Sequence, residues 1–493
     1  MYPSTKSVAI RPVVTSNELT ARLKQYMASF VLFLSDYVMI VAAAISAWYF
    51  RADIFPHYIS INGLFNVNAV YTYLIIPAIY LAFFAYSGLY RKRLPFTKSV
   101  ELIFKISVYA NVLAVLLMYF TASAQTLSRL FVAANWLLGF GYLALSRYFT
   151  KRMLVKSGLW QKPIIIIGAG KTAELLANRF SKEPGLGYVI AGLVEDNCAQ
   201  RPLVKQYPCL GGFSEVEQVI LESSVKDIII AAPGLERNQL IDLVYRIQPY
   251  VKNVTIIPDL FGVPLSNMEV ETLFNEKTVM LKVRNNMMML RNRLFKRTFD
   301  LVCSIVGVIA ISPILLCIAI AIYLSDPGPA FFAHRRIGAN GETFPCYKFR
   351  SMITNSQEVL EQYLAVNPAA REEWDSDFKL KDDPRITKIG NVLRKTSLDE
   401  LPQLFNVIKG EMSLVGPRPI VDKEISKYGE YISDYYIVRP GITGYWQVSG
   451  RSDVDYDSRV QMDSWYVRNW SLWHDIILLF KTVGVVLGRK GAY

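Results

Sequence analysis

The sequence predicts a membrane protein built from three parts. These are an N-terminal four-helix transmembrane bundle in residues 1–150, a central Rossmann-like α/β domain in residues 151–285, and a C-terminal, mainly α domain in residues 286–493 with a re-entrant membrane helix near residues 294–325. Three observations predict this class: long apolar runs near the N-terminus, short apolar strands alternating with helical runs, and one further apolar run interrupted by proline. Hydrophobic residues make up 52% of the 493 residues and charged residues 19%, a balance that indicates that part of the chain lies in lipid.

The net charge and the numbers of histidines and cysteines limit the kinds of function that this sequence supports. The net charge of +13 suits anionic membranes and phosphate-bearing substrates, while the lack of a long basic tract argues against nucleic acid as a partner. The chain has three histidines, which are few for a zinc site or a histidine-centred triad, so we expect a carboxylate to act as acid, base or nucleophile. The five cysteines form no CxxC pair and are expected to be reduced, structural thiols in a cytosolic setting.

Four apolar runs, at residues 28–50, 68–90, 102–122 and 129–149, are long enough to cross a bilayer core of about 30 Å as helices. Basic residues precede the first run and follow the second and the fourth, so the positive-inside rule places the N-terminus and everything after the fourth helix in the cytoplasm. Asp36, inside the first run, is either a functional carboxylate or, more simply, the partner in a helix–helix hydrogen bond.

The central segment alternates strands and helices. A strand at residues 163–167 leads into the loop Gly168-x-Gly170-x-x-Ala173, and a second strand ends at Glu195, the arrangement of a dinucleotide-binding fingerprint. Three interpretations are open: a structural or regulatory module, a nucleotide-binding regulator, and a membrane-anchored NAD-dependent enzyme that modifies nucleotide sugars. The lack of a Tyr-x-x-x-Lys pair in or after this segment counts against the last.

The fifth apolar run, residues 301–324, carries Ser312-Pro313 at its midpoint. Proline removes a backbone donor and clashes with the preceding turn, so the helix must break or kink there. Each half has about twelve residues, roughly 18 Å of helix, which is too short to span alone. Because basic residues flank both ends, we expect a re-entrant helix that enters and leaves on one face. The alternative, a kinked fifth span, would place the last third of the chain on the opposite side.

The segment at residues 394–404 carries the sharpest chemical signal, the adjacent carboxylates Asp399 and Glu400 at a predicted helix start. One interpretation is a capping box, in which Ser397 caps the helix and Glu400 satisfies a backbone amide. The other is chemistry: a helix N-terminus would keep Asp399 ionised, and a carboxylate that attacks phosphorus gives an acyl-phosphate. Transfer between two phosphate anions would then need Mg²⁺ and nearby cations.

Suitable cations occur in the same part of the chain. Most stand beside Pro, Gly or an aromatic residue, where turns fix a side chain better than a solvated helix face does. Each is weak alone, because an ordinary surface Arg or Lys is the alternative. The candidates for phosphate binding are Lys348, Arg350, Arg394, Arg418, Arg439 and Arg451.

The last two hundred residues or so resemble the bacterial sugar transferase family, the monotopic polyprenyl-phosphate phosphoglycosyl transferases. The upstream helices and α/β domain resemble the large, multi-domain branch of that family, and the C-terminal ending is most similar to its galactose-transferring members. Motif order and spacing agree throughout the stretch. The motifs are Lys296-Arg-Thr-Phe-Asp300, Asp326-Pro-Gly-Pro329, Arg336-Ile-Gly338, Lys348-Phe-Arg-Ser-Met352, Thr396-Ser-Leu-Asp-Glu-Leu-Pro-Gln-Leu404, Gly416-Pro-Arg-Pro419 and Pro440-Gly-Ile-Thr-Gly444.

The resemblance implies two-step catalysis. Asp399 would attack the sugar-bearing phosphate of a UDP-sugar and release UMP, and undecaprenyl phosphate would then take the sugar phosphate. Glu400 would hold Mg²⁺ or orient Asp399, and Asp463 would assist. Lys348, Arg418, Arg439 and Arg451 would contact phosphates, and Ser312-Pro313 would form the membrane break.

The resemblance also implies partners and a location. We expect a homodimer in the bacterial inner membrane, in contact with membrane lipid and with its soluble domains in the cytoplasm. Galactose is the expected hexose, with glucose next, and the downstream glycan (O-antigen, capsule or exopolysaccharide) stays open. A non-enzymatic transporter or assembly scaffold is the remaining alternative to the transferase and to the NAD-dependent enzyme.

Overall fold

The computed structural model describes residues 16–57, 68–121, 128–223, 225–259, 268–273, 278–282, 285–377, 380, 383–449 and 455–487. Arg451, one of the expected phosphate-binding residues, lies outside this set. The chain forms two compact units, Met1–Asp259 and Leu260–Tyr493. The first holds the N-terminal helices and a parallel sheet, and the second holds the motifs from Lys296 onward.

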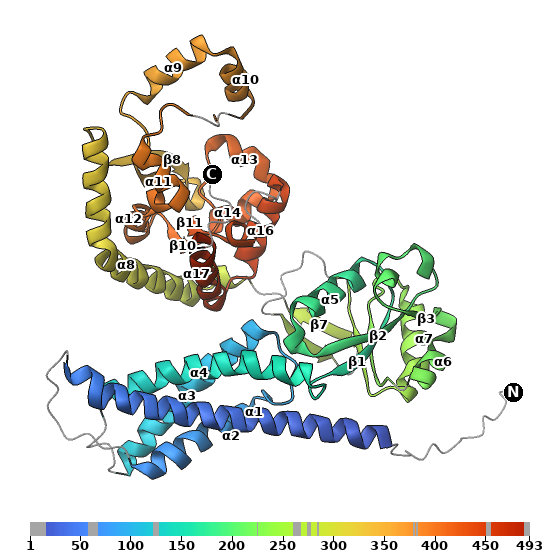
Figure 1. Cartoon of the computed structure of the whole chain (residues 1–493). Coiled ribbons are helices and arrows are strands. Elements are labelled where there is room, and N and C mark those ends of the chain that lie inside the picture. Colours follow the sequence, from blue (N-terminus) through green and yellow to red (C-terminus); the bar gives the residue numbers. More distant parts are fainter. Residues whose placement is uncertain are drawn as a thin grey trace. The chain divides into compact units, whose positions relative to one another are not determined.

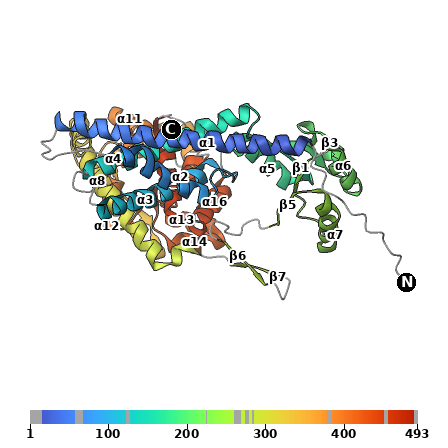
Figure 2. The same ribbon diagram turned by 90° about the horizontal axis from the view of Figure 1, so that it is seen from below.

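The N-terminal helices run side by side, as the two views in Figures 1 and 2 show. Three of them, the region of α1 from Leu23 to His57, α3 and α4, are long and apolar enough to cross a membrane. The second predicted span is shorter than expected, because its helical part covers only Tyr71–Tyr86, roughly 24 Å at 1.5 Å per residue. The helices are α1 (Ser16–Tyr49), α2 (Ile76–Tyr86, preceded by the π-helical turn Tyr71–Ile75), α3 (Phe96–Phe120) and α4 (Arg129–Lys156).

Asp36 of α1 pairs with Arg147 of α4. The Arg147 Nη2 donates to Asp36 Oδ2 at 2.5 Å, and both side chains are buried. The predicted helix–helix hydrogen bond is confirmed, and because Arg147 carries a charge the contact is also an ion pair. It joins the first and fourth helices of the bundle.

The sheet of the first unit has five parallel strands in the order β3-β2-β1-β4-β5. β2 and β3 are added on one side of β1, and β4 and β5 on the other, so the strand order reverses between β1 and β4. Apolar strand residues are buried on both faces, which is why β1 reads as an unbroken run of isoleucine. The elements are β1 (Lys162–Ile167), α5 (Lys171–Lys182), β2 (Tyr188–Val194), β3 (Cys209–Gly211), α6 (Val216–Ser223), β4 (Asp227–Ile230), α7 (Arg237–Ile247) and β5 (Asn253–Ile256).

The expectation of five reduced cysteines is wrong for two of them. Cys198 and Cys209 form a disulfide, with their Cα atoms 6.4 Å apart. Cys209 lies on β3, which pairs with β2, and Cys198 follows the end of β2, so strand pairing brings together two residues that the sequence separates by eleven. Cys303, Cys317 and Cys346 are free thiols, as expected.

The second unit is mainly helical, with small two-stranded sheets. Its core gathers side chains from β9, β10, α12, α16 and α17. The elements are β6 (Glu269–Leu273), β7 (Thr278–Lys282), α8 (Leu290–Ser325), β8 (Phe331–Ile337), β9 (Thr343–Phe349), α9 (Ser356–Val366), α10 (Pro368–Asp377), α11 (Lys388–Thr396), η12 (Leu398–Glu400), α12 (Gln403–Lys409), β10 (Ser413–Val415), α13 (Asp422–Tyr428), α14 (Ile432–Ile437), β11 (Gly441–Thr443), α15 (Tyr445–Ser449), α16 (Tyr456–Arg468) and α17 (Leu472–Leu487).

Helix α8 continues through Pro313, but it bends: its two halves follow two different edges of the unit in Figure 1. Pro313 has no N–H to donate to the carbonyl of Ile309, four residues earlier. The Ser312 hydroxyl donates to that carbonyl at 2.8 Å instead. Ser312-Pro313 therefore allows a bend without leaving the freed backbone acceptor unpaired.

Candidate active site

A cavity of about 820 Å³ lies in the second unit and is lined by both predicted carboxylates. Five cationic side chains line it against these two acids, so it suits a ligand with several negative charges. Four of the cations were predicted from the sequence. The charged residues of the lining are Lys348, Arg350, Arg394, Arg418 and Arg459, with Asp399 and Glu400.

The two carboxylates share one lysine. Lys348 Nζ donates to Glu400 Oε1 at 2.6 Å and lies 3.7 Å from Asp399 Oδ2. Asp399 is buried, whereas Glu400 is partly exposed. Burial raises the pKa of Asp399 above its usual value, and the charge on Lys348 opposes that shift. Asp399 is thus a poorly solvated carboxylate. The cation that balances its charge is Lys348, which also binds Glu400.

The predicted helix start at this site is a single 3₁₀ turn, η12, between α11 and α12. Ser397 makes no side-chain cap and adopts a left-handed conformation (φ 56°), and Glu400 binds Lys348 instead of a backbone amide. The capping-box interpretation is therefore wrong. The helix-terminus argument for an ionised Asp399 fails with it, because so short a helix has little dipole and burial dominates. A non-glycine residue at positive φ costs of order 1 kcal/mol or more and is typical of functional sites.

Helix α11 closely approaches the segment that follows β9. Gly390 of α11 faces the Ser351 carbonyl, which a Cβ at this position would approach within 2.0 Å, so only glycine fits. Ser351 also accepts a hydrogen bond from Arg394 Nε at 2.9 Å. This contact holds the Arg394 guanidinium at the cavity, on the same side as Asp399, whose charge acts on it.

Arg350 lines the cavity but already has an acidic partner. Its guanidinium bonds the backbone carbonyl of Asp326 and lies 3.5 Å from the Asp326 carboxylate, which also accepts from Thr354 N at 2.9 Å. Arg350 and Asp326 together fasten the end of α8 to the loop after β9. A structural role in joining these segments therefore accompanies any contact of Arg350 with a ligand.

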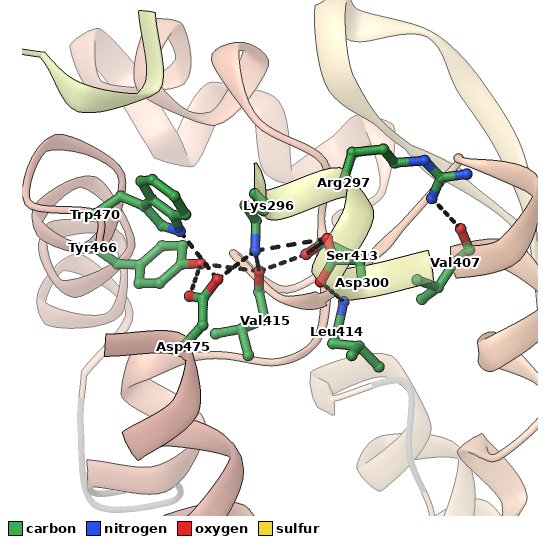
Figure 3. Close-up of polar contacts among 10 residues, drawn as sticks. All are labelled: Lys296, Arg297, Asp300, Val407, Ser413, Leu414, Val415, Tyr466, Trp470 and Asp475. Atoms are coloured by element: carbon green, nitrogen blue, oxygen red, sulfur yellow. Dashed lines mark hydrogen bonds and ion pairs between the residues drawn. The ribbon is translucent and has the colours of Figure 1, made fainter. Parts of the chain in front are cut away.

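Arg418 stands on the loop between β10 and the bridge formed by Ile420 and Ile337. A buried polar cluster behind β10 holds this strand against α8 and α17 (Figure 3). In it, Lys296 Nζ donates to Asp475 Oδ2 at 2.8 Å and to the Val415 carbonyl at 3.0 Å. The strand that leads into the Arg418 loop is therefore fixed directly to the first half of the membrane helix.

The cluster in Figure 3 satisfies its buried charges with hydrogen bonds from several elements. Asp475 also accepts from Tyr466 at 2.6 Å and from Trp470 at 3.0 Å. Asp300 accepts from the Ser413 hydroxyl at 2.7 Å and from the Leu414 amide at 3.3 Å. Because buried ions are stable only when paired and fully hydrogen-bonded, this cluster fixes one arrangement of α8, β10 and α17.

Two predicted residues do not line the cavity. Arg439 lies next to Arg297, another cation, and near Gly410. Asp463 is fully buried, where its Oδ2 accepts from the Tyr428 hydroxyl at 2.9 Å, and burial raises the pKa of its carboxyl group to about 8. The backbone and the charge of Arg418 act in the opposite direction and lower the pKa of this carboxyl group. Its place in the structure is therefore behind the Arg418 loop, which it supports from within.

The sequence reasoning missed several residues of the lining. Trp446 and Gln447 follow the Pro440–Gly444 motif directly, so continuing that motif by three residues would have found them. Arg459 lies on α16 with its guanidinium 4.9 Å from the centre of the Trp446 ring, and a single arginine on a helix gives no sequence signal. The half-exposed rings of Phe331 and Phe332 complete one wall.

The donor set at the dyad suits Mg²⁺. This ion takes oxygen ligands and is usually held by one or two carboxylates together with substrate phosphates, rather than by a cage made only of protein groups. Asp399 and Glu400 are adjacent, both line the cavity, and no cluster of three or more possible ligands occurs among the described residues. Two adjacent carboxylates in the lining of a cationic cavity fit the ion.

In the glycine loop of the first unit, the backbone amide that could bind a phosphate already donates to a side chain. Gly168 has a positive φ of 95°, and a Cβ at this position would lie 2.9 Å from the Ala231 carbonyl oxygen. Both the backbone conformation and the lack of space therefore require glycine. The Ala169 amide donates to Glu195 Oε2 at 2.9 Å, and Arg201 lies 3.5 Å from the same oxygen. Gly170 precedes α5 with open space around its Cα. Glu195 thus occupies the donor that a nucleotide phosphate would use, which gives the NAD-dependent alternative no support.

Comparisons with known proteins identify two families along the chain. Residues 291–489 match the family described as bacterial sugar transferase, and residues 86–258 match the one described as CoA-binding domain. The chain is 41% identical over 82% of its length, and 84% of the relative, to an undecaprenyl-phosphate galactose phosphotransferase of Salmonella typhimurium. A UDP-galactose-lipid carrier transferase of Erwinia amylovora is 44% identical over 75% of this chain and 78% of its own. A UDP-glucose:undecaprenyl-phosphate glucose-1-phosphate transferase of Escherichia coli is 33% identical, over 73% and 72%.

Proposed function

The chain belongs to the bacterial sugar transferase family, and from this premise we propose that it moves galactose-1-phosphate from UDP-galactose to undecaprenyl phosphate through a phospho-aspartyl intermediate on Asp399. At the coarser level it is a polyprenyl-phosphate sugar phosphotransferase for galactose or glucose, an enzyme of exopolysaccharide or O-antigen synthesis. The observation that carries the proposal is a buried carboxylate at the wall of a cavity lined by five cations.

The first step forms the intermediate. A carboxylate oxygen of Asp399 attacks the sugar-bearing phosphorus, and the bond from that phosphorus to the bridging oxygen breaks, so UMP leaves with the electron pair. Lys348 and Arg394, which flank Asp399, reduce repulsion between the carboxylate and the diphosphate. Poor solvation of Asp399 favours attack, because little hydration must be removed from the carboxylate first.

The second step regenerates the enzyme. A phosphate oxygen of undecaprenyl phosphate attacks the same phosphorus, the acyl-phosphate bond breaks, and Asp399 returns as a carboxylate. Arg418 and Arg459, two further cations of the lining, bind phosphate oxygens in both steps. Asp399 and Glu400 would hold Mg²⁺, which when bound supplies charge neutralisation at the diphosphate. Lys348 orients the dyad by bonding Glu400 beside the nucleophile.

The lipid substrate requires a site near the membrane surface, and α8 supports a re-entrant arrangement. Its first half is fastened to β10 and α17 through Lys296, and its second half packs Leu315, Ile318 and Ile322 against Phe349 and Leu393. Both halves thus return to the same unit. Between these contacts the helix is strongly apolar and mostly exposed, as a segment immersed in lipid is.

A topology experiment tests this arrangement. In spheroplasts, a cysteine at Val366, an exposed residue at the end of α9, should react with a membrane-impermeant maleimide only after the membrane is permeabilised. The reason is that a re-entrant α8 keeps the last third of the chain in the cytoplasm. A cysteine that replaces Lys156, at the end of α4, is the matched position on the same side. Labelling of the Val366 cysteine in intact spheroplasts would show that α8 spans the membrane.

Substrate competition identifies the hexose. Membranes that contain the protein are incubated with undecaprenyl phosphate and equal concentrations of UDP-galactose and UDP-glucose, and lipid-linked sugars and UMP are measured. We expect the galactose product in excess, because two relatives with over 40% identity carry galactose in their names and the glucose-named relative is more distant. A glucose product in excess would reverse the assignment. A nicotinamide-dependent enzyme or a scaffold would release no UMP.

A pair of arginine variants tests the cavity. Arg418→Gln removes a lining cation and should raise the KM for the UDP-sugar by roughly tenfold or more, the effect of losing one charge-assisted hydrogen bond. Arg439→Gln, at a residue outside the lining, should change KM by less than about threefold. Equal effects of the two substitutions would mean that the family motif, and not the cavity, marks the phosphate-binding residues. We also propose, from the family resemblance, that the protein is a homodimer in the bacterial inner membrane.

A further inference from the structure

A second cavity, of about 200 Å³, lies in the first unit where α3 and α4 meet the turn Pro184–Leu186 that follows α5. Its lining is unusually cationic for a space enclosed between apolar helices. Four cations line it, of which two are buried and two exposed, together with Glu183, whose carboxylate is paired with Arg179 at 2.9 Å. The cations are Arg147, Lys151, Arg152 and Lys182.

Arg147 is not satisfied by its partner. Its side chain is completely buried, and only Nη2 bonds Asp36. The Nε and Nη1 atoms are buried without a hydrogen-bond partner in the described part of the chain. Each such unpaired buried donor is destabilising, and more so when the group is charged.

Lys151 follows one turn later on the same face of α4 and is 5% exposed. Its ammonium group lies 3.5 Å from the Ser99 hydroxyl and 5.8 Å from the centre of the Trp160 ring. No carboxylate of the described residues lies within 4.0 Å of it. Of the two buried cations on this helix face, only Arg147 therefore has a carboxylate partner, Asp36.

We propose that this cavity binds a phosphate group, carried either by an anionic lipid headgroup or by a soluble phosphate compound. Buried charges are stable when they are paired, and an anion of at least one unit charge would balance the excess on Arg147 and Lys151. A phosphate offers several acceptor oxygens, enough for the unpaired Arg147 donors and the Lys151 ammonium together. The exposed Arg152 and Lys182 lie at the rim, where they attract such an anion.

Both sources fit the position. The cavity lies at the basic end of α4, where cationic groups meet lipid headgroups in membrane proteins. It is also lined by the loop after α5, and therefore touches the α/β domain. In either case, the bound phosphate contacts both the helix bundle and the α/β domain and adds to the direct bonds of Arg93 with Trp160 and Leu186.

The test uses the full-length protein in nanodiscs. Its thermal midpoint is measured in phosphatidylcholine alone, in phosphatidylcholine mixed with phosphatidylglycerol, and in phosphatidylcholine with added inorganic phosphate. Wild type should be stabilised by one or both anions, as a ligand that binds the folded state raises the midpoint. A rise with phosphatidylglycerol alone assigns the site to lipid, and a rise with inorganic phosphate alone assigns it to a soluble ligand.

Variants separate this site from the catalytic cavity. Lys151→Met should be as stable as wild type or more stable in phosphatidylcholine, because it removes a buried unbalanced charge, and should bind the anion about tenfold more weakly. Lys156→Met, an exposed lysine of the same helix outside the lining, should behave as wild type. Arg418→Gln should keep the full response, since its cavity is elsewhere.

If Lys151→Met does not fold, the double variant Arg152→Gln/Lys182→Gln changes only exposed rim residues and should still weaken the response. The proposal is wrong if neither anion stabilises wild type, or if wild type, Lys151→Met and the rim variant respond equally. It is equally wrong if Arg418→Gln alone loses the response, which would place the anion in the catalytic cavity.

Discussion

Asp399→Asn should abolish sugar-phosphate transfer, lowering UMP release by roughly four orders of magnitude or more, as the loss of a covalent nucleophile does in other enzymes. The amide keeps the shape of the side chain but cannot form the acyl-phosphate. Purified protein is incubated with radiolabelled UDP-sugar and no lipid acceptor, and bound label is measured after denaturation. Wild type should hold the label covalently and Asp399→Asn should not. Label retained by the variant would move the nucleophile to another residue.

Glu400→Gln is the matched variant, because it changes the neighbouring carboxylate in the same way. It removes the partner that holds Lys348 at 2.6 Å but leaves the nucleophile in place. We therefore expect reduced turnover with adduct still formed. If Glu400→Gln removed the adduct as completely as Asp399→Asn, the two residues would have to act as one unit.

Stability and pH provide a control for folding. The pKa of Asp399 is raised in the folded protein, so its ionisation costs stability as pH rises through that folded pKa. Asp399→Asn has no such charge and should melt no lower than wild type at neutral pH. The same raised pKa sets the acidic limit of activity: kcat/KM should fall as pH drops through it, since only the carboxylate attacks.

Contiguous motifs allowed the sequence to predict much of this site. Lys348, Asp399 and Glu400 each stand in a short, fixed segment, and the structure brings all three together. Strand β1 also follows from local signals, because a buried parallel strand reads as a continuous apolar run. Where one local pattern fitted two structures, the sequence could not decide. The Ser397–Glu400 spacing of a capping box is also the spacing of a left-handed turn followed by a dyad.

Sequence patterns of this kind could not predict contacts between distant segments. Lys296 and Asp475 are 179 positions apart, and no periodicity links them. Cys198 and Cys209 meet only because β3 pairs with β2. The second membrane run is apolar over its full predicted length, yet its helical part covers Tyr71–Tyr86, because hydropathy measures composition and not where the backbone begins its helix.

Lys296→Met should destabilise the second unit by about 3–5 kcal/mol, because it leaves Asp475 and Asp300 as buried carboxylates without their shared cation. The thermal midpoint of the catalytic unit, followed by tryptophan fluorescence in detergent, measures this. Arg293→Met, at an exposed basic residue of the same helix, should leave the midpoint nearly unchanged. The double variant Lys296→Met/Asp475→Asn should recover part of the loss, since it removes one uncompensated charge.

The same substitution also tests whether the cluster positions the active site. Lys296 and Tyr466 both donate to the Val415 carbonyl, one residue before the loop that carries Arg418. Well below its melting temperature, Lys296→Met should therefore raise the KM for the UDP-sugar, as Arg418→Gln does, while the covalent adduct on Asp399 still forms. A lower midpoint with an unchanged KM would restrict the cluster to holding the fold. A raised KM would show that the contact between the membrane helix and β10 also sets the geometry of phosphate binding.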